Sequence, residues 1–255
     1  NNTHTDLIIK CAQNKKHILC EKPMSINDDE CKKASDYINK SNIFFMEAIA
    51  YRLHPQTNNI IKIINNNEIG KINSIKSSFG FVVKKIKPDS RLFNKSFGGG
   101  AILDLGCYPL SFISLFSKKD QEILFDSAKG TFCHTDVDDY AEADLTINKN
   151  IKAHIKVSFK DNLDNNSIIY GNDGHLIIPS PWLPDKKSYI EIFKKGGSYK
   201  IFSNLDKSVY AQQIYNVSNL IINKRNAGEF PNINIKESLK IMSLLTLWSK
   251  KIKSA

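Results

Sequence analysis

Long apolar runs are missing from this sequence. None approaches the roughly 20 residues that a membrane-spanning helix requires, and the opening stretch NNTHTDL lacks the basic and apolar regions of a secretory signal. The five cysteines are odd in number and none lies in a C-x-x-C motif, which argues against a disulfide framework and a zinc ribbon. We therefore expect reduced thiols, a cytoplasmic location and no membrane partner.

Clustered positive charge is also missing. The formal net charge is +10, from 36 Lys+Arg against 26 Asp+Glu, yet the lysines are scattered, arginine is scarce and no long basic run occurs. A nucleic-acid binder would need clustered arginines or stacking aromatics on one face, so no nucleic-acid partner is expected. The segment HTDVDD, residues 134–139, matches no metal-ligand spacing, and no metal site is expected.

The first fifty residues alternate between helical and strand patterns. The spacing of apolar residues predicts a helix over 5–15 and a polar helix over about 27–40, the second with a capping pattern in the motif SIND. Short apolar runs at 17–21 and 43–51 indicate buried strands. This arrangement is typical of a doubly wound parallel sheet covered on both faces. Because the unit is too small to form a stable open sheet alone, we expect a further segment before it.

From residue 51 onward the pattern is that of an α+β domain. Strand patterns dominate, and the turn signals NKN, NDG and GG between them predict a largely antiparallel sheet. The expected strands lie at 71–83, 122–133, 139–147, 151–159, 167–179 and 189–203, and the expected helices at 55–67, 101–117, 210–224 and 236–252. The predicted fold is an α/β unit, residues 1–50, followed by an α+β domain, residues 51–255, whose last helix packs back on the first unit.

Lys22 lies where the first predicted strand ends, in the motif CEKP. Ligands of open α/β sheets bind outside the carboxyl ends of the strands. An ammonium there stabilises negative charge that develops on a substrate oxygen, and Glu21 accepts a hydrogen bond from a sugar hydroxyl. The alternative is that both residues form only the polar end of a strand. Pro23 favours a ligand site slightly, because it fixes a rigid exit from the strand.

A carboxylate and a phenol follow the most glycine-rich stretch of the chain, GGGAILDLGCYPL at residues 98–110. Its three leading glycines allow the backbone to approach a ligand closely. Asp104 and Tyr108 are four residues apart and share one helical face, while Pro109 restricts Tyr108 to a helix start or a kink. A tyrosine with a pKa of about 10 is a poor base at neutral pH, so Tyr108 requires a cation such as Lys22 to lower that pKa. A glycine turn before an ordinary amphipathic helix is the alternative.

Three further residues are candidates for the wall of a substrate pocket. Arg52 and His54, in the motif YRLHP, follow the second predicted strand and suit an anionic or polyhydroxyl group. Trp182, which stands in the proline-rich segment PSPWLPD, either lines a pocket or packs down as a loop aromatic.

The order of these motifs resembles that of the Gfo/Idh/MocA family of NAD(P)-dependent oxidoreductases, and within it the branch of dimeric dihydrodiol dehydrogenase and glucose–fructose oxidoreductase. The segments NNTH, KHILCEKP, MEAIAYRLHPQ and GGGAILDLGCYPL carry the resemblance, which covers nearly the whole chain. It implies the C-terminal part of a Rossmann domain at 1–50. It also implies, at 51–255, an open and mostly antiparallel sheet with helices on one face, through which the family often oligomerises.

The resemblance implies roles for particular residues as well. The positions that fall near the nicotinamide end of NAD or NADP are Asn1, His4, Glu21, Lys22 and Pro23. Glu21 matches the glutamate at the nicotinamide ribose, and Lys22 matches the catalytic lysine. Asp104 matches the acid of the D-x-G-x-[HY] motif, which helps to hold the substrate, and Tyr108 matches the catalytic acid/base. Arg52, His54 and Trp182 are then pocket residues for a sugar, polyol or trans-dihydrodiol.

One motif of the family has no counterpart in this sequence. The G-x-G-x-x-G turn that seats a pyrophosphate on a helix N-terminus is absent, as is the residue that reads the ribose 2′ position. We expect both to lie before Asn1, so residues 1–255 alone should bind NAD(P) weakly and be inactive unaided. The predicted function is hydride transfer by a homo-oligomer. The alternative is a non-catalytic binding or oligomerisation module derived from this family.

Overall fold

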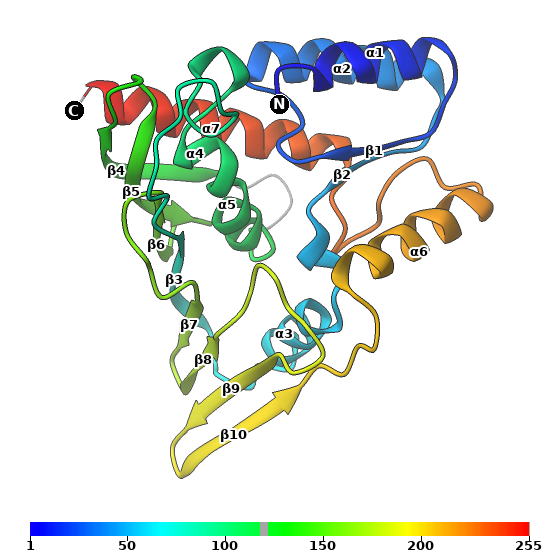
Figure 1. Cartoon of the computed structure of the whole chain (residues 1–255). Coiled ribbons are helices and arrows are strands. Elements are labelled where there is room, and N and C mark those ends of the chain that lie inside the picture. The colour runs from blue at the N-terminus through cyan, green and yellow to red at the C-terminus, as the bar shows by residue number, and fades with distance from the viewer. Residues whose placement is uncertain (118–121, 255) are drawn as a thin grey trace.

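Two β-sheets of different size make up the molecule, which a computed structural model describes for residues 1–117 and 122–254 (Figure 1). The strands of the small sheet are β1 (Ile18–Glu21) and β2 (Phe45–Ala48). The strands of the large sheet are β3 (Ile72–Gly80), β4 (Ile123–Phe132), β5 (Asp138–Ile147), β6 (Ile151–Ser158), β7 (Ser167–Gly171), β8 (Gly174–Ile178), β9 (Tyr189–Lys194) and β10 (Gly197–Phe202). The helices are α1 (His4–Gln13), α2 (Asp28–Ser41), α3 (Pro55–Asn65), α4 (Ala101–Leu105), α5 (Cys107–Ser114), α6 (Val209–Ile222) and α7 (Ile235–Ser254), with short 3-10 helices η1 (Ala50–Leu53) and η2 (Lys95–Phe97).

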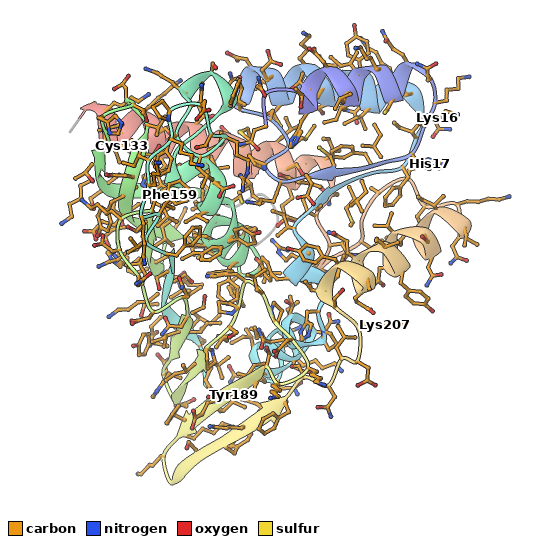
Figure 2. All side chains as sticks on the ribbon, in the orientation of Figure 1. Lys16, His17, Cys133, Phe159, Tyr189 and Lys207 are labelled. Carbon is orange, nitrogen blue, oxygen red and sulfur yellow. The ribbon has the colours of Figure 1, made fainter. Side chains whose placement is uncertain are left out.

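The small sheet confirms the alternating pattern of the first fifty residues. β1 and β2 are parallel, and α1 and α2 pack against each other beside them (Figure 1). The cap of α2 is Asn27, whose side chain accepts a hydrogen bond from the backbone of Glu30, while the Ser25 hydroxyl donates to the Asn27 carbonyl. His17, at the turn between α1 and β1 (Figure 2), accepts from the backbone of Phe44 and so ties this turn to the second strand.

The large sheet is mostly antiparallel, as predicted. Its strand order is β10-β9-β8-β7-β3-β6-β5-β4, and within this sheet, over the described residues, β3–β6 is the only parallel pair. α4, α5 and α7 pack on β3 to β6 from one side (Figure 1). The helices thus cover one face of the sheet and leave the charged side chains of the other face in solvent.

The predicted helix over 101–117 is divided into α4 and α5. Pro109 lacks the N–H that would bond to the carbonyl of Leu105, so the ladder is interrupted there. The backbone N–H of Gly106, between the two helices, still donates to the Ile102 carbonyl at 2.8 Å. The kink that Pro109 predicts therefore falls directly beside Tyr108.

The last helix joins the two sheets. α7 packs against β4 and α5 of the large part and against α2 and β2 of the small part (Figure 1). One continuous cluster of buried apolar side chains runs through both parts and includes the fully buried Trp248 of α7. No helix within the described residues has both the length and the apolar character needed to cross a membrane.

Candidate active site

Lys22 is held at the end of β1 by the backbone and side chain of one residue. Its ammonium donates to the carbonyl of Asp104 at 2.6 Å and to Asp104 Oδ1 at 3.1 Å. The same nitrogen lies 5.0 Å from the centre of the Tyr108 ring. Asp104 and Tyr108 therefore meet Lys22 from one side, as their spacing of four residues predicts. The structure brings together the three residues for which the sequence predicts catalytic roles.

Both members of the Lys22–Asp104 pair are charged at neutral pH. Burial lowers the pKa of Lys22, but Cys107, Tyr108 and Asp104 beside it outweigh burial and raise that pKa above its usual value. Burial raises the pKa of Asp104, but Lys22 and Arg91 outweigh it and hold that pKa below its usual value. Arg91 Nη1 donates to Asp104 Oδ1 at 2.7 Å. The carboxylate thus pairs with two cations, of which Lys22 is the less exposed, with its side chain 15% exposed against 62% for that of Arg91.

Tyr108 is a protonated phenol in this environment. Burial raises its pKa well above the usual range, and Lys22 offsets only part of that rise. The expectation that Lys22 lowers the pKa of Tyr108 below its usual value is therefore wrong, because desolvation is the larger effect. The Tyr108 hydroxyl has no hydrogen-bond partner among the described residues. A half-buried phenol that keeps its proton beside a permanent cation is suited to donating that proton.

The wall around Tyr108 is aromatic. Its ring centre lies 5.1 Å from that of Phe79, 6.0 Å from that of Trp182 and 6.3 Å from that of Tyr51. Trp182 is held in place because its indole N–H donates to the Ser78 carbonyl at 2.8 Å, and it is 3% exposed. The sequence predicts that Trp182 either lines a pocket or packs down as a loop aromatic. In the structure it is packed, with Tyr108 as one of its neighbours.

The residues predicted to meet a cofactor converge at the carboxyl end of β1. The Asn1 side chain donates to the Gly98 carbonyl at 3.0 Å, and His4 Nδ1 lies 2.8 Å from the Pro23 carbonyl. Burial lowers the pKa of His4, which keeps the imidazole neutral at pH 7. The Glu21 side chain is exposed and accepts no hydrogen bond from the described residues. Carboxylates placed in this way bind ribose hydroxyls, so the donors and acceptors present fit a nicotinamide ribose.

The glycine run serves close packing of the chain rather than an open approach to a ligand. A methyl group at Gly98 would lie 2.6 Å from the Ile26 side chain, and one at Gly100 would lie 2.3 Å from Asp138 Oδ1. Both glycines also have positive φ, 70° and 114°. Asp138 Oδ2 accepts from the backbone of Ile102 at 2.6 Å, so it caps α4. The glycines thus set the position of α4, and through it that of Asp104.

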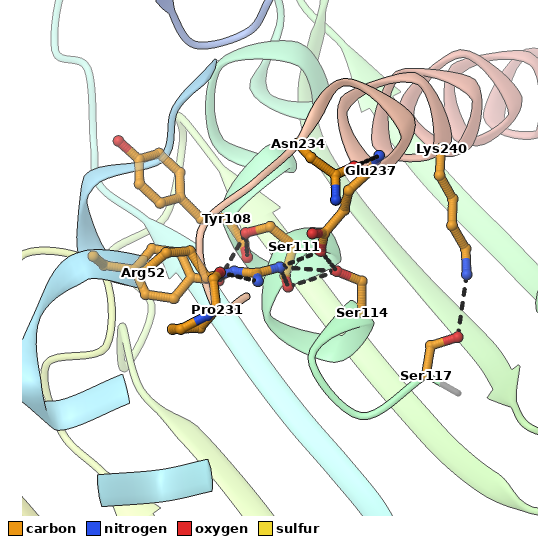
Figure 3. Close-up of polar contacts among 10 residues, drawn as sticks. Arg52, Tyr108, Ser111, Ser114, Ser117, Pro231, Asn234, Glu237 and Lys240 are labelled. Atoms are coloured by element: carbon orange, nitrogen blue, oxygen red, sulfur yellow. Dashed lines mark hydrogen bonds and ion pairs between the residues drawn. The ribbon is translucent and has the colours of Figure 1, made fainter. Parts of the chain in front are cut away.

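Arg52, predicted to line the substrate pocket, is buried away from it. It is 1% exposed, and its guanidinium donates to the carbonyls of Ser111 and Pro231, to the Ser114 hydroxyl and to Glu237 Oε1 at 2.6 Å (Figure 3). With its donors engaged inside the protein, Arg52 is not available to a substrate. Figure 3 shows the Tyr108 side chain pointing away from this network.

His54 is also buried, with no exposed surface. Its Nδ1 accepts from the backbone of Gln56 at 3.1 Å and caps α3, and burial lowers its pKa to about 4 in spite of the opposing charge of Asp185. A neutral, buried helix cap does not fit the predicted role of binding a polyhydroxyl group.

Three residues of this region were not predicted from the sequence: Arg91, Glu237 and Glu47. Arg91 lies in an irregular loop, Glu237 is 185 residues away from Arg52, and Glu47 stands in an apolar strand. Only Glu47 gave a signal, since a carboxylate inside the run IFFMEAIAY interrupts an otherwise buried strand. Within the described residues no group of three His, Cys, Asp or Glu side chains is placed to hold a metal ion.

Two family models match the chain. Residues 1–49 match the model described as an oxidoreductase family with an NAD-binding Rossmann fold, and residues 58–177 match the Gfo/Idh/MocA C-terminal domain. A trans-1,2-dihydrobenzene-1,2-diol dehydrogenase of Xenopus tropicalis is 33% identical over 183 residues, which are 71% of this chain and 54% of that protein. A D-xylose 1-dehydrogenase (NADP(+)) 2 of Haloferax volcanii is 24% identical over 243 residues, which are 95% of this chain and 72% of that protein.

Solved structures share the fold over almost all of the chain. The aldose-aldose oxidoreductase from Caulobacter crescentus, complexed with glycerol, has a TM-score of 0.87 at 19% identity and covers 100% of this chain and 75% of its own. A levoglucosan dehydrogenase complexed with NADH and levoglucosan has a TM-score of 0.85 at 16% identity, over 100% of this chain and 76% of its own. The chain spans about half the length of the dihydrodiol dehydrogenases that it matches. On both family models and its 33% identity to a dihydrodiol dehydrogenase, the chain belongs to the Gfo/Idh/MocA oxidoreductase family.

Proposed function

We propose that this chain is the catalytic part of an NAD(P)-dependent oxidoreductase that acts on a CH–OH or carbonyl group of a sugar, polyol or diol. The family model described as NAD-binding and the names of the relatives support this class. The observation that carries the proposal is the half-buried, protonated Tyr108 phenol beside the Lys22 ammonium, which lies 5.0 Å from the ring centre. Such a pair supplies a proton and stabilises the charge that remains.

The residues divide the proton chemistry between them. In the reductive direction Tyr108 donates its hydroxyl proton to the carbonyl oxygen of the substrate. Lys22 then stabilises the tyrosinate, which recovers a proton from water, and Asp104 with Arg91 keeps the Lys22 ammonium in place. The oxidative direction runs the same proton back to Tyr108. The nicotinamide, when bound, supplies or accepts the hydride.

The carboxyl end of β1 would hold the nicotinamide end of the cofactor. Glu21 is the exposed acceptor for ribose hydroxyls, and the half-buried Asn1 and His4 form the adjoining surface, whereas Pro23 is buried and contributes through its carbonyl, which lies 2.8 Å from His4 Nδ1. The half-buried Phe79, whose ring centre lies 5.1 Å from that of Tyr108, gives the sugar or diol an apolar face to pack on, while the buried Trp182 packs against Tyr108.

The test is Tyr108→Phe, assayed with NADH and NADPH against a panel of ketoses, aldoses and diols. The product of the complete reading frame that encodes this chain is used. We expect kcat to fall about 10²–10⁴-fold, because a positioned general acid is lost. The matched control is Tyr37→Phe on α2, whose residue is 37% exposed and far in sequence from the site. Activity in the parent that survives Tyr108→Phe unchanged would contradict the assigned role.

The expectation that residues 1–255 alone bind NAD(P) weakly is tested by titrating this polypeptide with both cofactors. Low-micromolar binding would contradict it.

The chain's five cysteines are free thiols, which accords with the proposed cytoplasmic location because that compartment keeps thiols reduced.

The open face of the large sheet is the surface that we propose for homo-oligomerisation. Charged side chains on β5 and β6 pair across it: Glu142 with Lys156 at 3.3 Å, and Asp144 with His154 at 2.7 Å. If these side chains pair instead with those of a second copy, the association of the two copies should weaken as the salt concentration rises. Light scattering at low and high salt tests this, and a monomer at every salt concentration would contradict it.

A further inference from the structure

Glu47 is a buried carboxyl group that the proposed reaction does not use. It is the third residue of β2, pairs with Cys20 of β1 in the parallel ladder, and is 3% exposed. A carboxyl group at this depth is costly unless a hydrogen bond compensates it. The backbone N–H of Met24 supplies one, donating to Glu47 Oε1 at 2.8 Å.

This hydrogen bond is made to the segment that positions Lys22. Met24 lies two residues after Lys22 and is fully buried, so its backbone has no contact with water. The chain leaves β1 here and must present the Lys22 ammonium to Asp104, at 2.6 Å from its carbonyl. An ionised acceptor makes a shorter and stronger hydrogen bond than a neutral one. Glu47 is therefore the side chain that anchors the far side of this turn.

We infer that Glu47 is a positioning residue, which fixes the Lys22–Pro23–Met24 segment through the Met24 N–H and so holds the Lys22 ammonium beside Asp104 and Tyr108. The inference deepens the proposed function and rests on it for its kinetic consequences. Its structural core, the hydrogen bond from Met24 to Glu47, is independent of any substrate.

The groups packed around Glu47 make it sensitive to pH. Glu237 and the Ser238 hydroxyl face it from α7, and Lys22 faces it from the turn after β1. The thiols that face it from β1, α2 and α5 are those of Cys20, Cys31 and Cys107. Glu47 Oε2 and the Ser238 hydroxyl have no hydrogen bond within the described part of the chain.

Glu47 itself changes charge near neutrality. Burial raises its pKa to about 7, while Ser238, the Met24 N–H and Lys22 lower that pKa and Glu237 raises it. Burial raises the pKa of each of the three thiols to about 12, so they remain neutral. The strength of the Met24 hydrogen bond should therefore change between pH 6 and 8.

The first experiment follows the Met24 amide by NMR in protein labelled with ¹⁵N-methionine. Residues 1–255 contain three methionines, and Met24→Leu assigns the signal. We expect the amide resonance of Met24 to titrate with an apparent pKa near 7 in the parent and to stay flat in Glu47→Gln. The carboxamide keeps an acceptor for Met24 but cannot ionise. Glu229→Gln, at an exposed ion pair with Arg225, is the matched control and should titrate as the parent does.

The second experiment measures kcat and KM of Glu47→Gln and Glu47→Ala from pH 5.5 to 9. We expect kcat of the parent to fall on the acid side near pH 7, and this limb to be absent in Glu47→Gln. Glu47→Ala should lower kcat about 10–100-fold, since a charge-assisted hydrogen bond is lost, with KM within about twofold because Glu47 does not touch the substrate. Circular dichroism of each variant excludes unfolding as the cause.

The two experiments separate this inference from the proposed function. A Met24 amide that titrates in a parent without oxidoreductase activity would keep the Glu47 contact and contradict the function. A flat Met24 amide in an active parent, or an acid limb that Glu47→Gln leaves unchanged, would overturn the role of Glu47 while the function stands.

Discussion

Two charged clusters lie in the interior, one around Lys22 and one around Arg52, and they differ in how completely their polar groups are paired. In the Arg52 cluster, the guanidinium is bound by Glu237, by the Ser114 hydroxyl and by two backbone carbonyls. In the Lys22 cluster, the ammonium is bound by Asp104, but the neighbouring Tyr108 hydroxyl has no partner within the described residues. A saturated cluster suits structure, whereas a free polar atom beside a fixed charge suits chemistry.

The difference could not be seen in the motifs. YRLHP and CEKP each place a cation after a parallel strand, which is a common position for ligand binding. Burial separates them: Arg52 has a side chain that is 1% exposed, and Lys22 one that is 15% exposed.

Arg52→Met should give the largest effect on folding. It leaves Glu237 without its cation, and breaking a buried pair on one side costs about 3–5 kcal/mol of unfolding free energy. Urea unfolding measures the loss, and activity per folded molecule should stay within about threefold. Replacing both partners, in Arg52→Met with Glu237→Leu, should recover part of the stability. If the double variant is less stable than Arg52→Met, the account of the pair is wrong.

Lys22→Met should lower activity more than stability, the opposite of Arg52→Met. Asp104 keeps Arg91 as its partner at 2.7 Å, so we expect a smaller loss of stability than in Arg52→Met. The loss of the charge beside Tyr108 should lower kcat about 10²–10³-fold. Urea unfolding and steady-state kinetics of the same preparation measure both. A variant that is unstable yet fully active would contradict the division between the two clusters.

Glu47→Gln should change how stability depends on pH. The folded-state pKa of Glu47 is about 7, above its value of 4.5 in the unfolded chain. Its protonated form is therefore favoured by folding, and the stability that it contributes is complete below pH 4.5 and is lost as the pH rises through 7. Relative to Glu47→Gln, the parent should lose up to roughly 3 kcal/mol between pH 4.5 and 8. Parallel melting curves measure this difference, and a constant difference would contradict the raised pKa.

Lys95→Met should give the smallest effect. Lys95 pairs with Asp136 at 2.5 Å, but both side chains are largely exposed, at 63% and 75%. Solvent screens such a pair, so the melting temperature and kcat should equal those of the parent within error. A clear loss of melting temperature or kcat would show that an exposed ion pair also contributes to stability or activity, and that burial alone does not separate important from unimportant charges.

Much of the fold was accessible from the sequence because its signals are local. The apolar runs around β1 and β2, the turn signals of the large sheet and the proline beside Tyr108 each depend on neighbouring residues. The grouping of Lys22, Asp104 and Tyr108 was predictable from motif order. The roles of Arg52 and His54 were not, because burial depends on what α5, α7 and α3 bring to those side chains from elsewhere.

Periodicity, turn chemistry and motif spacing are sufficient to predict the order of strands and helices, the family of the chain and the pairing of a lysine with a tyrosine. The packing of distant segments shows that the hydrogen-bonding groups of Arg52 are saturated, that burial outweighs Lys22 in setting the pKa of Tyr108, and that Glu47 accepts a hydrogen bond from the Lys22 segment. Desolvation and hydrogen-bond partners act between residues far apart in the chain, so no local pattern encodes them.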